Sequence, residues 1–287
     1  MARMTDPVIV SISSQVVFGH VGNCVAVPAL QALGFEVLAL PTVLLAHHPG
    51  HRPPRGRFFP ADEVAALLEG IDEVGALAGA CGVLTGYLGL PGTATVAADA
   101  VARLRRHNPK ALYLCDPVIG DNGRVYVRDG VEQAIREQLL PLADVLTPNH
   151  FELERLSGRA VSTLEQAVSA ARSLISCGPK VVVVTSVQHA QTRMNQVETL
   201  AVTADAVWAA ASPRLAHVPH GGGDLLAAIL LGRLALGSSL PDGLAHAVSA
   251  VHVVLQASEG ELELRLVAGR NHLSAPPGVL VRALDMA

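Results

Sequence analysis

The sequence predicts a single α/β domain in which a mostly parallel sheet carries helices on both faces. Short β-branched runs alternate with Ala- and Leu-rich amphipathic stretches along the chain, which is typical of α/β domains. The run VVVV at 181–184 is continuous rather than alternating, as in strands that are buried on both faces of a parallel sheet. No linker or internal repeat divides the 287 residues, so we expect one domain over 1–287.

Short apolar runs rich in β-branched residues predict the strands. In chain order these are Val8–Ile12, Glu36–Leu40, Gly82–Thr85, Ala111–Cys115, Val145–Thr147 and Val181–Thr185. The stretches between them have apolar residues at helical spacing. They predict helices over Gly22–Leu33, Ala61–Leu77, Thr93–Arg106, Val131–Leu139 and Leu164–Ser176, followed by two longer helices, Asp224–Leu236 and Asp242–Ala257.

The composition excludes several classes of protein. Half of the residues are hydrophobic and 16% are charged, which is incompatible with a disordered chain. A net charge of −4, with one Trp, three Tyr and five Phe, provides neither the positive field nor the stacking platform of a nucleic-acid-binding protein. The longest apolar stretch, Leu225–Gly232, ends at Arg233 and is much shorter than the ~20 residues of a membrane span. We therefore expect no nucleic-acid or membrane partner.

The N-terminus and the cysteines favour a cytoplasmic protein. Asp6 and Pro7 stand where a signal peptide would have its apolar run. The four cysteines lie far apart and form no CxxC pair, which favours reduced, mostly buried thiols over disulfides or a zinc site; they are Cys24, Cys81, Cys115 and Cys177.

One segment, residues 44–60, interrupts the alternation of strands and helices. From Ala46 it reads AHHPGHRPPRGRFFP, which is too polar and too rich in proline for a core element. His47, His48 and His51 are close together, but no carboxylate or cysteine lies near them in the sequence to complete a metal site. We expect a surface flap beside the functional site.

Polar residues follow several of the expected strands. The segment SSQVVFGHVGN (13–23) follows the first, and later strands lead into Asp116, Thr147–Asn149 with Glu152 one turn on, and Thr185–Ser186. Each group alone is explained by a turn or a helix cap. Because open α/β sheets bind ligands at the carboxyl ends of their strands, the groups together predict a binding edge with two acids and several hydroxyls.

The segment HGGGDLLAA (220–228) is the sharpest local motif. Its glycines allow close approach of a ligand, and amides at a helix N-terminus favour an anion. Asp224 would then accept a proton from a hydroxyl group that attacks phosphorus. Alternatively, Asp224 only caps the helix and complements its dipole. Neither a Walker A sequence nor GxGxxG after the first strand occurs, so a nucleotide would be bound by another architecture.

Seven stretches with specific motifs occur in order along the chain: SISSQVVFGHVGN (11–23), LTGYLG (84–89), LCDPVIGDNG (114–123), LTPNHFELERLSGR (146–159), GPKVVVVTS (178–186), GGGDLLAA (221–228) and LELRLVA (262–268). In these motifs the chain resembles the pyridoxal kinases of the ribokinase-like superfamily, over nearly its whole length. The resemblance implies a three-layer α/β/α fold and a homodimer. It also implies transfer of the γ-phosphoryl group of ATP, with Mg2+, to the 5′-hydroxymethyl group of pyridoxal in vitamin B6 salvage. Pyridoxamine and pyridoxine are further candidate substrates, and a monovalent cation such as K+ is a further candidate cofactor.

The resemblance also implies roles for individual residues. Asp224 corresponds to the general base, and the amides of Gly221, Gly222 and Gly223 correspond to an anion hole. Asp116 and Glu152 correspond to the acids that act on the magnesium-bound nucleotide, partly through water. The other predicted nucleotide-binding residues are Thr147, Asn149, Thr185, Ser186 and Val218. In the predicted substrate pocket, Ser14 hydrogen-bonds the pyridine ring, and the residues around it are Val21, Val43, His48, Pro49, Tyr87 and Asp224.

The chain departs from the family pattern at four positions. Gly222 replaces a threonine of many relatives, Gln15 a histidine, Ser13 a glutamine, and Pro49 a threonine that contacts substrate. Proline has no N–H or hydroxyl to donate, so that contact would be lost or replaced by His47 or His48. Two alternatives follow. One is a kinase of the same superfamily that acts on hydroxymethylpyrimidine or another small alcohol. The other is a catalytically weak protein that binds pyridoxal or pyridoxal phosphate.

Overall fold

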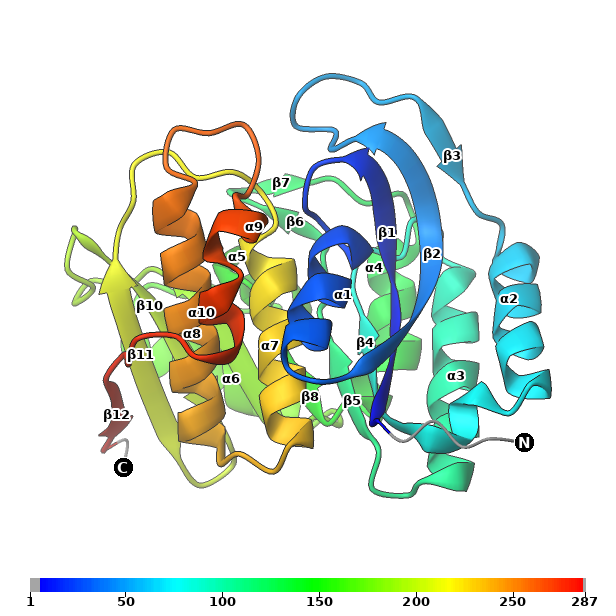
Figure 1. Cartoon of the computed structure of the whole chain (residues 1–287). Coiled ribbons are helices and arrows are strands. Elements are labelled where there is room, and N and C mark those ends of the chain that lie inside the picture. Colours follow the sequence, from blue (N-terminus) through cyan, green and yellow to red (C-terminus); the bar gives the residue numbers. More distant parts are fainter. Residues whose placement is uncertain (1–5, 286–287) are drawn as a thin grey trace.

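A ten-stranded sheet forms the centre of the computed structural model, which describes residues 6–285 (Figure 1). The strand order is β12-β11-β10-β9-β8-β5-β4-β1-β2-β3. Neighbouring strands from β9 through to β2 pair in parallel, and antiparallel strands extend both ends of the sheet. The prediction of a mostly parallel sheet is confirmed.

The sequence predicted the parallel strands and missed the antiparallel ones. The parallel strands are β1 (Val8–Phe18), β2 (Glu36–His47), β4 (Ala80–Thr85), β5 (Leu112–Cys115), β8 (Val145–Leu146) and β9 (Val181–Val187). The strands missed in the main sheet are β3 (Gly56–Phe58), β10 (Gln196–Val202), β11 (Val207–Pro213) and β12 (Val281–Leu284). A separate two-stranded sheet consists of β6 (Gly120–Asp121) and β7 (Arg124–Val125).

Helices cover both faces of the sheet, as expected for a three-layer α/β/α fold. One face packs against α2 (Ala61–Glu73), α3 (Thr93–His107), α4 (Val131–Ala134), α5 (His150–Ser157) and α6 (Leu164–Ile175). The other face, in front in Figure 1, packs against α1 (Asn23–Ala32), α7 (Gly222–Ala235), α8 (Leu240–Ala257), α9 (Leu266–Gly269) and α10 (Asn271–Ser274). Strand β1 shows how both cores arise, because its side chains alternate: Val8, Val10 and Ile12 enter one core and Ile9 the other.

Several predicted boundaries were wrong, each for a physical reason. The first strand continues past Ile12 to Phe18 because Ser13 and Ser14 are buried inside it, although the predicted strand ends before them. The helix predicted to reach Leu77 ends at Glu73, and Gly75 then adopts a left-handed conformation with φ 76° before a 3-10 turn. The helix predicted over 131–139 has an α-helical first turn, and its second half is a π-helix.

The flap expected over 44–60 is partly regular structure. Residues 44–47 are the end of β2, and residues 56–58 form β3, which pairs antiparallel with it. Only the intervening residues form the irregular tip. The flap is therefore the end of a β-hairpin that rises above the sheet edge (Figure 1), and we use this name for residues 44–60.

All four cysteines are free, as expected, but their burial varies. Cys115 is buried, Cys24 and Cys81 are half-buried, and Cys177 is exposed. Among residues 6–285, no helix combines the length and the apolar character that crossing a bilayer requires.

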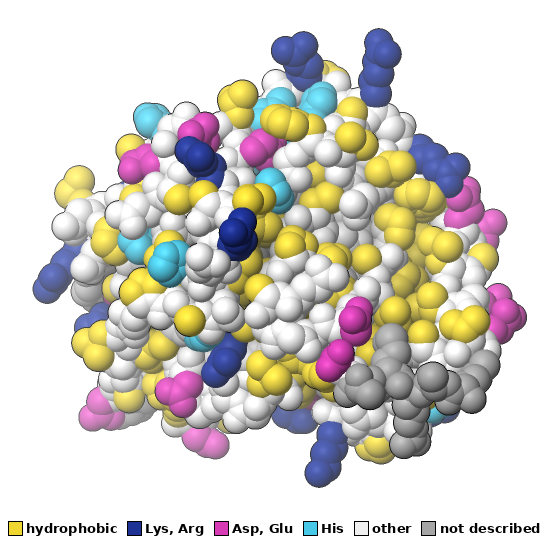
Figure 2. All heavy atoms as spheres, in the orientation of Figure 1, with side chains coloured by type: hydrophobic (Ala, Val, Ile, Leu, Met, Phe, Trp, Pro, Cys, Tyr) yellow, Lys and Arg dark blue, Asp and Glu magenta, His cyan; other side chains and the backbone are white. Residues whose placement is uncertain are grey.

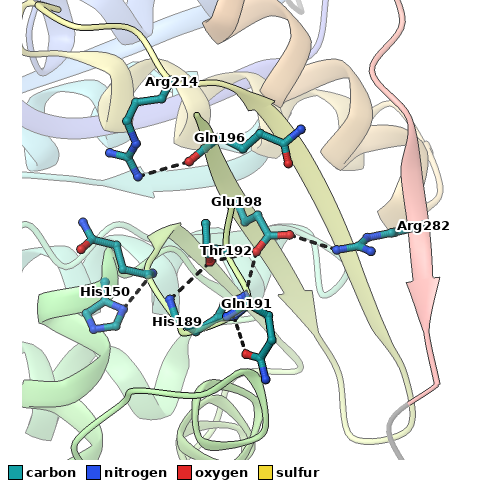
Figure 3. A network of polar contacts seen from close by, with 9 residues as sticks. His150, His189, Gln191, Thr192, Gln196, Glu198, Arg214 and Arg282 are labelled. Carbon is teal, nitrogen blue, oxygen red and sulfur yellow. Dashed lines mark hydrogen bonds and ion pairs between the residues drawn. The ribbon is translucent and has the colours of Figure 1, made fainter. Parts of the chain in front are cut away.

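A buried acid holds the far end of the sheet together (Figure 3). Glu198 of β10 is 5% exposed, and its carboxylate lies 2.7 Å from Nε2 of His189 and 3.0 Å from Nη2 of Arg282. The hydroxyl of Thr192 donates to the same carboxylate at 3.1 Å. Since Arg282 belongs to β12 and the other two residues to the β9–β10 connection, one side chain fixes both segments.

Candidate active site

The strand ends place the predicted polar residues at one edge of the sheet. The backbone N–H of Asp116 donates to Thr85 O (2.9 Å), and that of Thr147 donates to Cys115 O (3.0 Å), so the pairing of β4, β5 and β8 continues into this edge. The hydroxyl of Thr147 donates to Oδ1 of Asp116 at 3.1 Å. The edge predicted from the sequence is therefore present, and Asp116 and Thr147 are in direct contact.

Three acids from different elements meet there: Asp116 after β5, Glu152 on α5 and Asp224 on α7. Burial and the nearby carboxylates of Glu152 and Asp224 raise the pKa of Asp116 well above its usual value. Burial raises the pKa of Asp224 to about 6, although a hydrogen bond from the Gly22 N–H opposes the shift. In the part of the chain that the structure describes, the ion pairs of Lys, Arg and His involve other carboxylates. Among the described residues, no cationic side chain therefore offsets the negative charge of the cluster when its carboxyl groups are ionised.

Glu152 differs from the other two acids because backbone amides surround it. Its Oε1 accepts from the N–H groups of Ile119 (2.7 Å) and Gly120 (3.3 Å), and its Oε2 accepts from Asn149 N–H (2.9 Å). The Asn149 side chain in turn accepts from Glu152 N–H, which completes a capping box at the start of α5. Burial raises the pKa of Glu152 to about 7 against these hydrogen bonds. The helix-cap interpretation is therefore correct for Asn149 and Glu152, which also fix the loop after Asp116.

Asp224, in contrast, does not cap its own helix. It is the third residue of α7, which begins at Gly222 after an N-cap without a side-chain hydrogen bond. Its carboxylate accepts from Gly22 N–H, across the site on the β1–α1 turn. The first amides of α7 have no partners within the helix and are free to bind an anion.

The glycines before Asp224 have three different environments. Gly221 has a φ of 106°, and a Cβ there would lie 2.2 Å from the carbonyl oxygen of His20, so only glycine fits. A Cβ on Gly222 would meet Leu255 at an ordinary 3.6 Å. Gly223 faces open space. The position where many relatives carry threonine therefore has room for a side chain.

The predicted walls of the substrate pocket form a small apolar cluster of their own. Val16, Val21, Val43 and Leu45 are buried in it, and Cys24, Phe58 and Tyr87 pack against them. The register between β1 and β2 shifts opposite Ser14, between Ser13 and Gln15, as in a β-bulge beside a functional site. Ser14 is 8% exposed, and a Cβ on Gly22 would lie 2.2 Å from its hydroxyl oxygen, so the β1–α1 turn lies directly over it.

The flap places His48 over the site and Pro49 at an exposed turn. The ring of His48 stacks on that of His220, with centroids 4.2 Å apart, and its Nδ1 accepts from Gly50 N–H at 2.9 Å. Burial and the neighbouring His220 lower the pKa of His48 to about 4. Figure 2 shows histidine side chains gathered at the top of this face, where the flap meets the segment between α8 and α9. The structure brings a carboxylate to them, since Glu263 lies 2.5 Å from His51.

Thr185, another predicted nucleotide-binding residue, lies at the same edge. The N–H of Thr185 donates to Pro148 O (2.9 Å), and Thr185 pairs with Asn149 in an isolated bridge. Ser186 is exposed and has a φ of 52° within β9, where the register with β10 shifts. Val218 is 44% exposed on the segment between β11 and α7.

Some residues of the site escaped the sequence analysis as candidates. Ser13 was not among the predicted site residues. Its hydroxyl group is buried without a hydrogen-bond partner, beside a cavity of about 10 Å³ that Asp116 and Asp224 also line. That volume suits roughly one water-sized group. Tyr126 is 50% exposed, and its partial burial together with the three acids raises its pKa. The Arg128 guanidinium lies 3.9 Å above the Phe58 ring. Tyr126 and Arg128 gave no sequence signal, because only the β6–β7 hairpin turns them back towards the site.

The cavities and the acid cluster constrain which ligands could bind. Among residues 6–285, no three or more His, Cys, Asp or Glu side chains are arranged to hold a metal ion by themselves. The acid cluster fits a divalent cation that also has phosphate ligands, which is the usual manner in which Mg2+ binds. A larger open hollow of about 480 Å³ lies elsewhere, lined by His20 and residues 264–268, 270 and 271.

The chain is similar to known proteins over nearly its whole length. A family model described as phosphomethylpyrimidine kinase matches residues 81–266. Pyridoxal kinase PdxY of Rubrobacter xylanophilus is 44% identical over 274 residues, 94% of each chain. The PdxY of Deinococcus radiodurans is 40% identical over 277 residues, 93% of each. The structure of pyridoxal kinase from Leishmania donovani in complex with ADP and pyridoxamine matches with a TM-score of 0.90 and 30% identity, covering 97% of this chain and 99% of that one.

Proposed function

The chain belongs to the pyridoxal kinase family, and we propose that it transfers the γ-phosphoryl group of ATP to the 5′-hydroxymethyl group of pyridoxal. The product is pyridoxal 5′-phosphate, and pyridoxamine and pyridoxine are further substrates of the same reaction. One observation carries the proposal: Asp224 lies between the free amides of α7 and the β1–α1 turn that borders the apolar pocket. A base, an anion site and a pocket for a neutral ring therefore meet at one point.

In this mechanism Asp224 takes the proton of the substrate hydroxyl as that oxygen attacks the γ-phosphorus, and the bond from the γ-phosphorus to the β–γ bridging oxygen breaks to release ADP. A carboxylate with a pKa of about 6 is ionised at neutral pH, yet it is more basic than an ordinary aspartate. The Gly22 N–H holds it in place. The amides of Gly222 and Gly223 would stabilise the negative charge on the transferred group, aided by the positive end of the α7 dipole.

The substrate ring would lie against Val21, Val43 and Tyr87, which pack together in the apolar cluster. Ser14 would donate a hydrogen bond to the pyridine nitrogen. His48 and Pro49 would close the pocket from the flap, and the low pKa of His48 keeps its ring neutral at neutral pH.

We propose that Asp116 and Glu152 hold the Mg2+ ion of the nucleotide, Glu152 partly through water because three backbone amides occupy its oxygens. When bound, Mg2+ neutralises charge on the β- and γ-phosphates. Thr147, Asn149, Thr185, Ser186 and Val218 would contact the nucleotide. K+ is proposed as an activating monovalent cation, which a comparison of K+ and Na+ salts in the assay tests.

A hydroxymethylpyrimidine kinase is the second candidate, favoured by the description of the family model that matches residues 81–266. A coupled assay of ATP consumption with Mg2+ decides between them, with pyridoxal, pyridoxamine, pyridoxine and hydroxymethylpyrimidine supplied separately. Turnover of a B6 vitamer that Asp224→Asn abolishes supports the proposal. Turnover of hydroxymethylpyrimidine alone contradicts it. No turnover with tight binding of pyridoxal phosphate would instead indicate a binding protein.

We further propose a single catalytic domain that acts in the cytoplasm as a homodimer, as the family resemblance implies. Light scattering coupled to size-exclusion chromatography measures the oligomeric state, and a mass of one chain would contradict the dimer.

A further inference from the structure

Glu263 lies where three separate segments meet. It belongs to the connection between α8 and α9, and its side chain is only 14% exposed. Its Oε2 accepts from His20 N–H on the β1–α1 turn at 3.2 Å, and its Oε1 lies 2.5 Å from Nε2 of His51 on the flap. A Cβ on Gly19 would lie 2.4 Å from its carboxyl group, so the carboxylate also packs directly on the backbone of that turn.

The connection that carries Glu263 is rigid enough to position it. Leu264, the next residue, is 2% exposed in the core under α7 and α8. The backbone N–H of Arg265 donates to the hydroxyl of Ser258 at 2.8 Å, and that hydroxyl donates to Val254 O inside α8. Both ends of the connection are thus held by buried groups, and the Glu263 side chain projects from a fixed point.

The β1–α1 turn relays this position to the proposed base. Glu263 holds the N–H of His20, and the carbonyl of His20 packs against Gly221, where a Cβ would lie 2.2 Å away. Two residues later, the N–H of Gly22 donates to the carboxylate of Asp224. A displacement of the turn would therefore move the hydrogen bond that orients Asp224.

On the other side, Glu263 holds the flap. The contacts that join the flap tip to the body of the protein include the ion pair of His51 with Glu263, the ring of Phe18 with its centroid 6.2 Å from that of His51, and the stacking of His48 on His220. The stack is partly solvent-exposed because His220 is exposed, whereas the ion pair is mostly buried. The His51–Glu263 contact has an ionised carboxylate as acceptor, and such charge-assisted hydrogen bonds are about twice as strong as neutral ones.

We propose that Glu263 is a positioning residue that ties the flap to the β1–α1 turn, closing the flap over the vitamer and aligning Asp224. This inference rests on the proposed function for the identity of the substrate. The tie itself is a property of the folded chain.

Two substitutions separate the roles of Glu263. Glu263→Gln keeps an oxygen that can accept from His20 N–H and removes the charge that attracts His51. We expect it to raise KM for pyridoxal about fivefold to tenfold while kcat and KM for ATP change less than twofold. His51→Gln should have the same effect, and the double variant should be no worse than either single one. Glu263→Ala removes both contacts and should also lower kcat at least tenfold.

Limited proteolysis measures how accessible the flap tip is to trypsin, without any assay of activity. Trypsin cleaves poorly before proline, so Arg52–Pro53 is resistant and Arg55–Gly56 is the exposed site in the flap tip. Glu263→Gln and His51→Gln should be cleaved there several times faster than the unmodified chain. Glu261→Gln is the matched control, because Glu261 is two residues away, half-exposed and paired only with Arg265 at 3.3 Å.

The outcomes distinguish a failure of the proposed role of Glu263 from a failure of the proposed function. If Glu263→Gln and Glu261→Gln match in cleavage rate and in KM for pyridoxal, Glu263 does not tie the flap and the proposal is wrong. If the unmodified chain phosphorylates no B6 vitamer but Glu263→Gln still opens the flap to trypsin, the tie is real and the proposed function fails. A uniform loss of melting temperature with unchanged KM would mean that Glu263 is merely structural.

Discussion

Replacing Asp224 by asparagine should remove most of the activity and, at neutral pH, make the folded protein more stable. The two effects have one origin, because the environment that makes Asp224 a good base also disfavours its charge. A residue that only capped α7 would show the opposite effect on stability, since its loss would weaken the helix. The substitution therefore separates the two interpretations of Asp224 that the sequence left open.

The size of the stability change follows from the pKa of Asp224, which burial raises from 3.8 to about 6. Each pKa unit corresponds to ~1.4 kcal/mol, so the ionised carboxylate weakens folding by about 2–3 kcal/mol. An acid with a higher pKa in the folded state binds more protons when folded, so the free energy of unfolding falls as the pH rises from about 4 to about 6. Asp224→Asn should match the unmodified protein near pH 3.5 and exceed it by about 2–3 kcal/mol at pH 8.

Activity should respond to the same ionisation. Below pH 6 the carboxyl group is protonated and cannot accept a proton, so kcat/KM for pyridoxal should fall about tenfold per pH unit there. Asparagine cannot act as a base at any pH, and kcat should fall by roughly 10²–10⁴. Its side-chain oxygen can still accept from Gly22 N–H, so the affinity for ATP should change less than about twofold.

The assays are urea unfolding at several pH values, calorimetric titration with ATP, and coupled turnover of pyridoxal. Asp242→Asn is the matched control, because Asp242 is also the third residue of its helix, α8, but is exposed and bonded to the cap Ser239. It should lose up to ~1 kcal/mol and retain activity. The reasoning is refuted if Asp224→Asn unfolds more easily than the unmodified protein at pH 8, or if ATP binding falls in proportion to turnover.

Three further substitutions and one labelling reaction test other parts of the structure. Gly221→Ala should greatly reduce stability and activity, because its Cβ would lie 2.2 Å from a backbone carbonyl oxygen. Gly222→Ala has room for its Cβ and should raise the free energy of unfolding by about 0.5–1 kcal/mol with turnover unchanged. Thermal melting and kinetics measure both effects. Glu198→Ala should lower the free energy of unfolding in urea by about 2–3 kcal/mol and leave KM for pyridoxal unchanged. The loss is smaller than for a fully buried ion pair because the arginine partner is 61% exposed. A thiol reagent should modify exposed Cys177 and spare Cys115, since burial raises the pKa of the Cys115 thiol to about 12. Mass spectrometry detects the modified residues, and modification of both at pH 8 would contradict this prediction.

The central layers of the fold were predictable because buried parallel strands have an unambiguous pattern. Strand β9 is apolar on both faces, and no helix cap or turn interrupts it. The strands at the far end of the sheet lack such a pattern. Strand β11 reads VWAAASP, and alanine has little preference for strands, while β12 is only four residues long and mostly exposed. Their pairing is set by neighbouring strands and by the contact of Glu198 with Arg282.

The candidate site was predictable where its residues follow strands or open a helix. Asp116, Thr147 and Asp224 occupy such positions, and the topology of a parallel sheet then brings them together. The contact of His51 with Glu263 joins residues 212 positions apart, and no periodicity or spacing reveals it. No carboxylate lies near the flap histidines in the sequence, but folding brings Glu263 to His51.

Folding stability alone would not favour the acid cluster, because burial disfavours the ionisation of all three carboxyl groups. The chain compensates Glu152 with three amides, but Asp116 and Asp224 have few donors and face the cavity beside the unpaired hydroxyl of Ser13. The uncompensated charge is thus concentrated on the two groups whose proposed partners, a cation and a hydroxyl proton, arrive with the substrates. Replacing Asp224 by asparagine should therefore stabilise the fold while it abolishes the reaction. Binding of the magnesium-bound nucleotide should also stabilise the fold, and it permits the reaction.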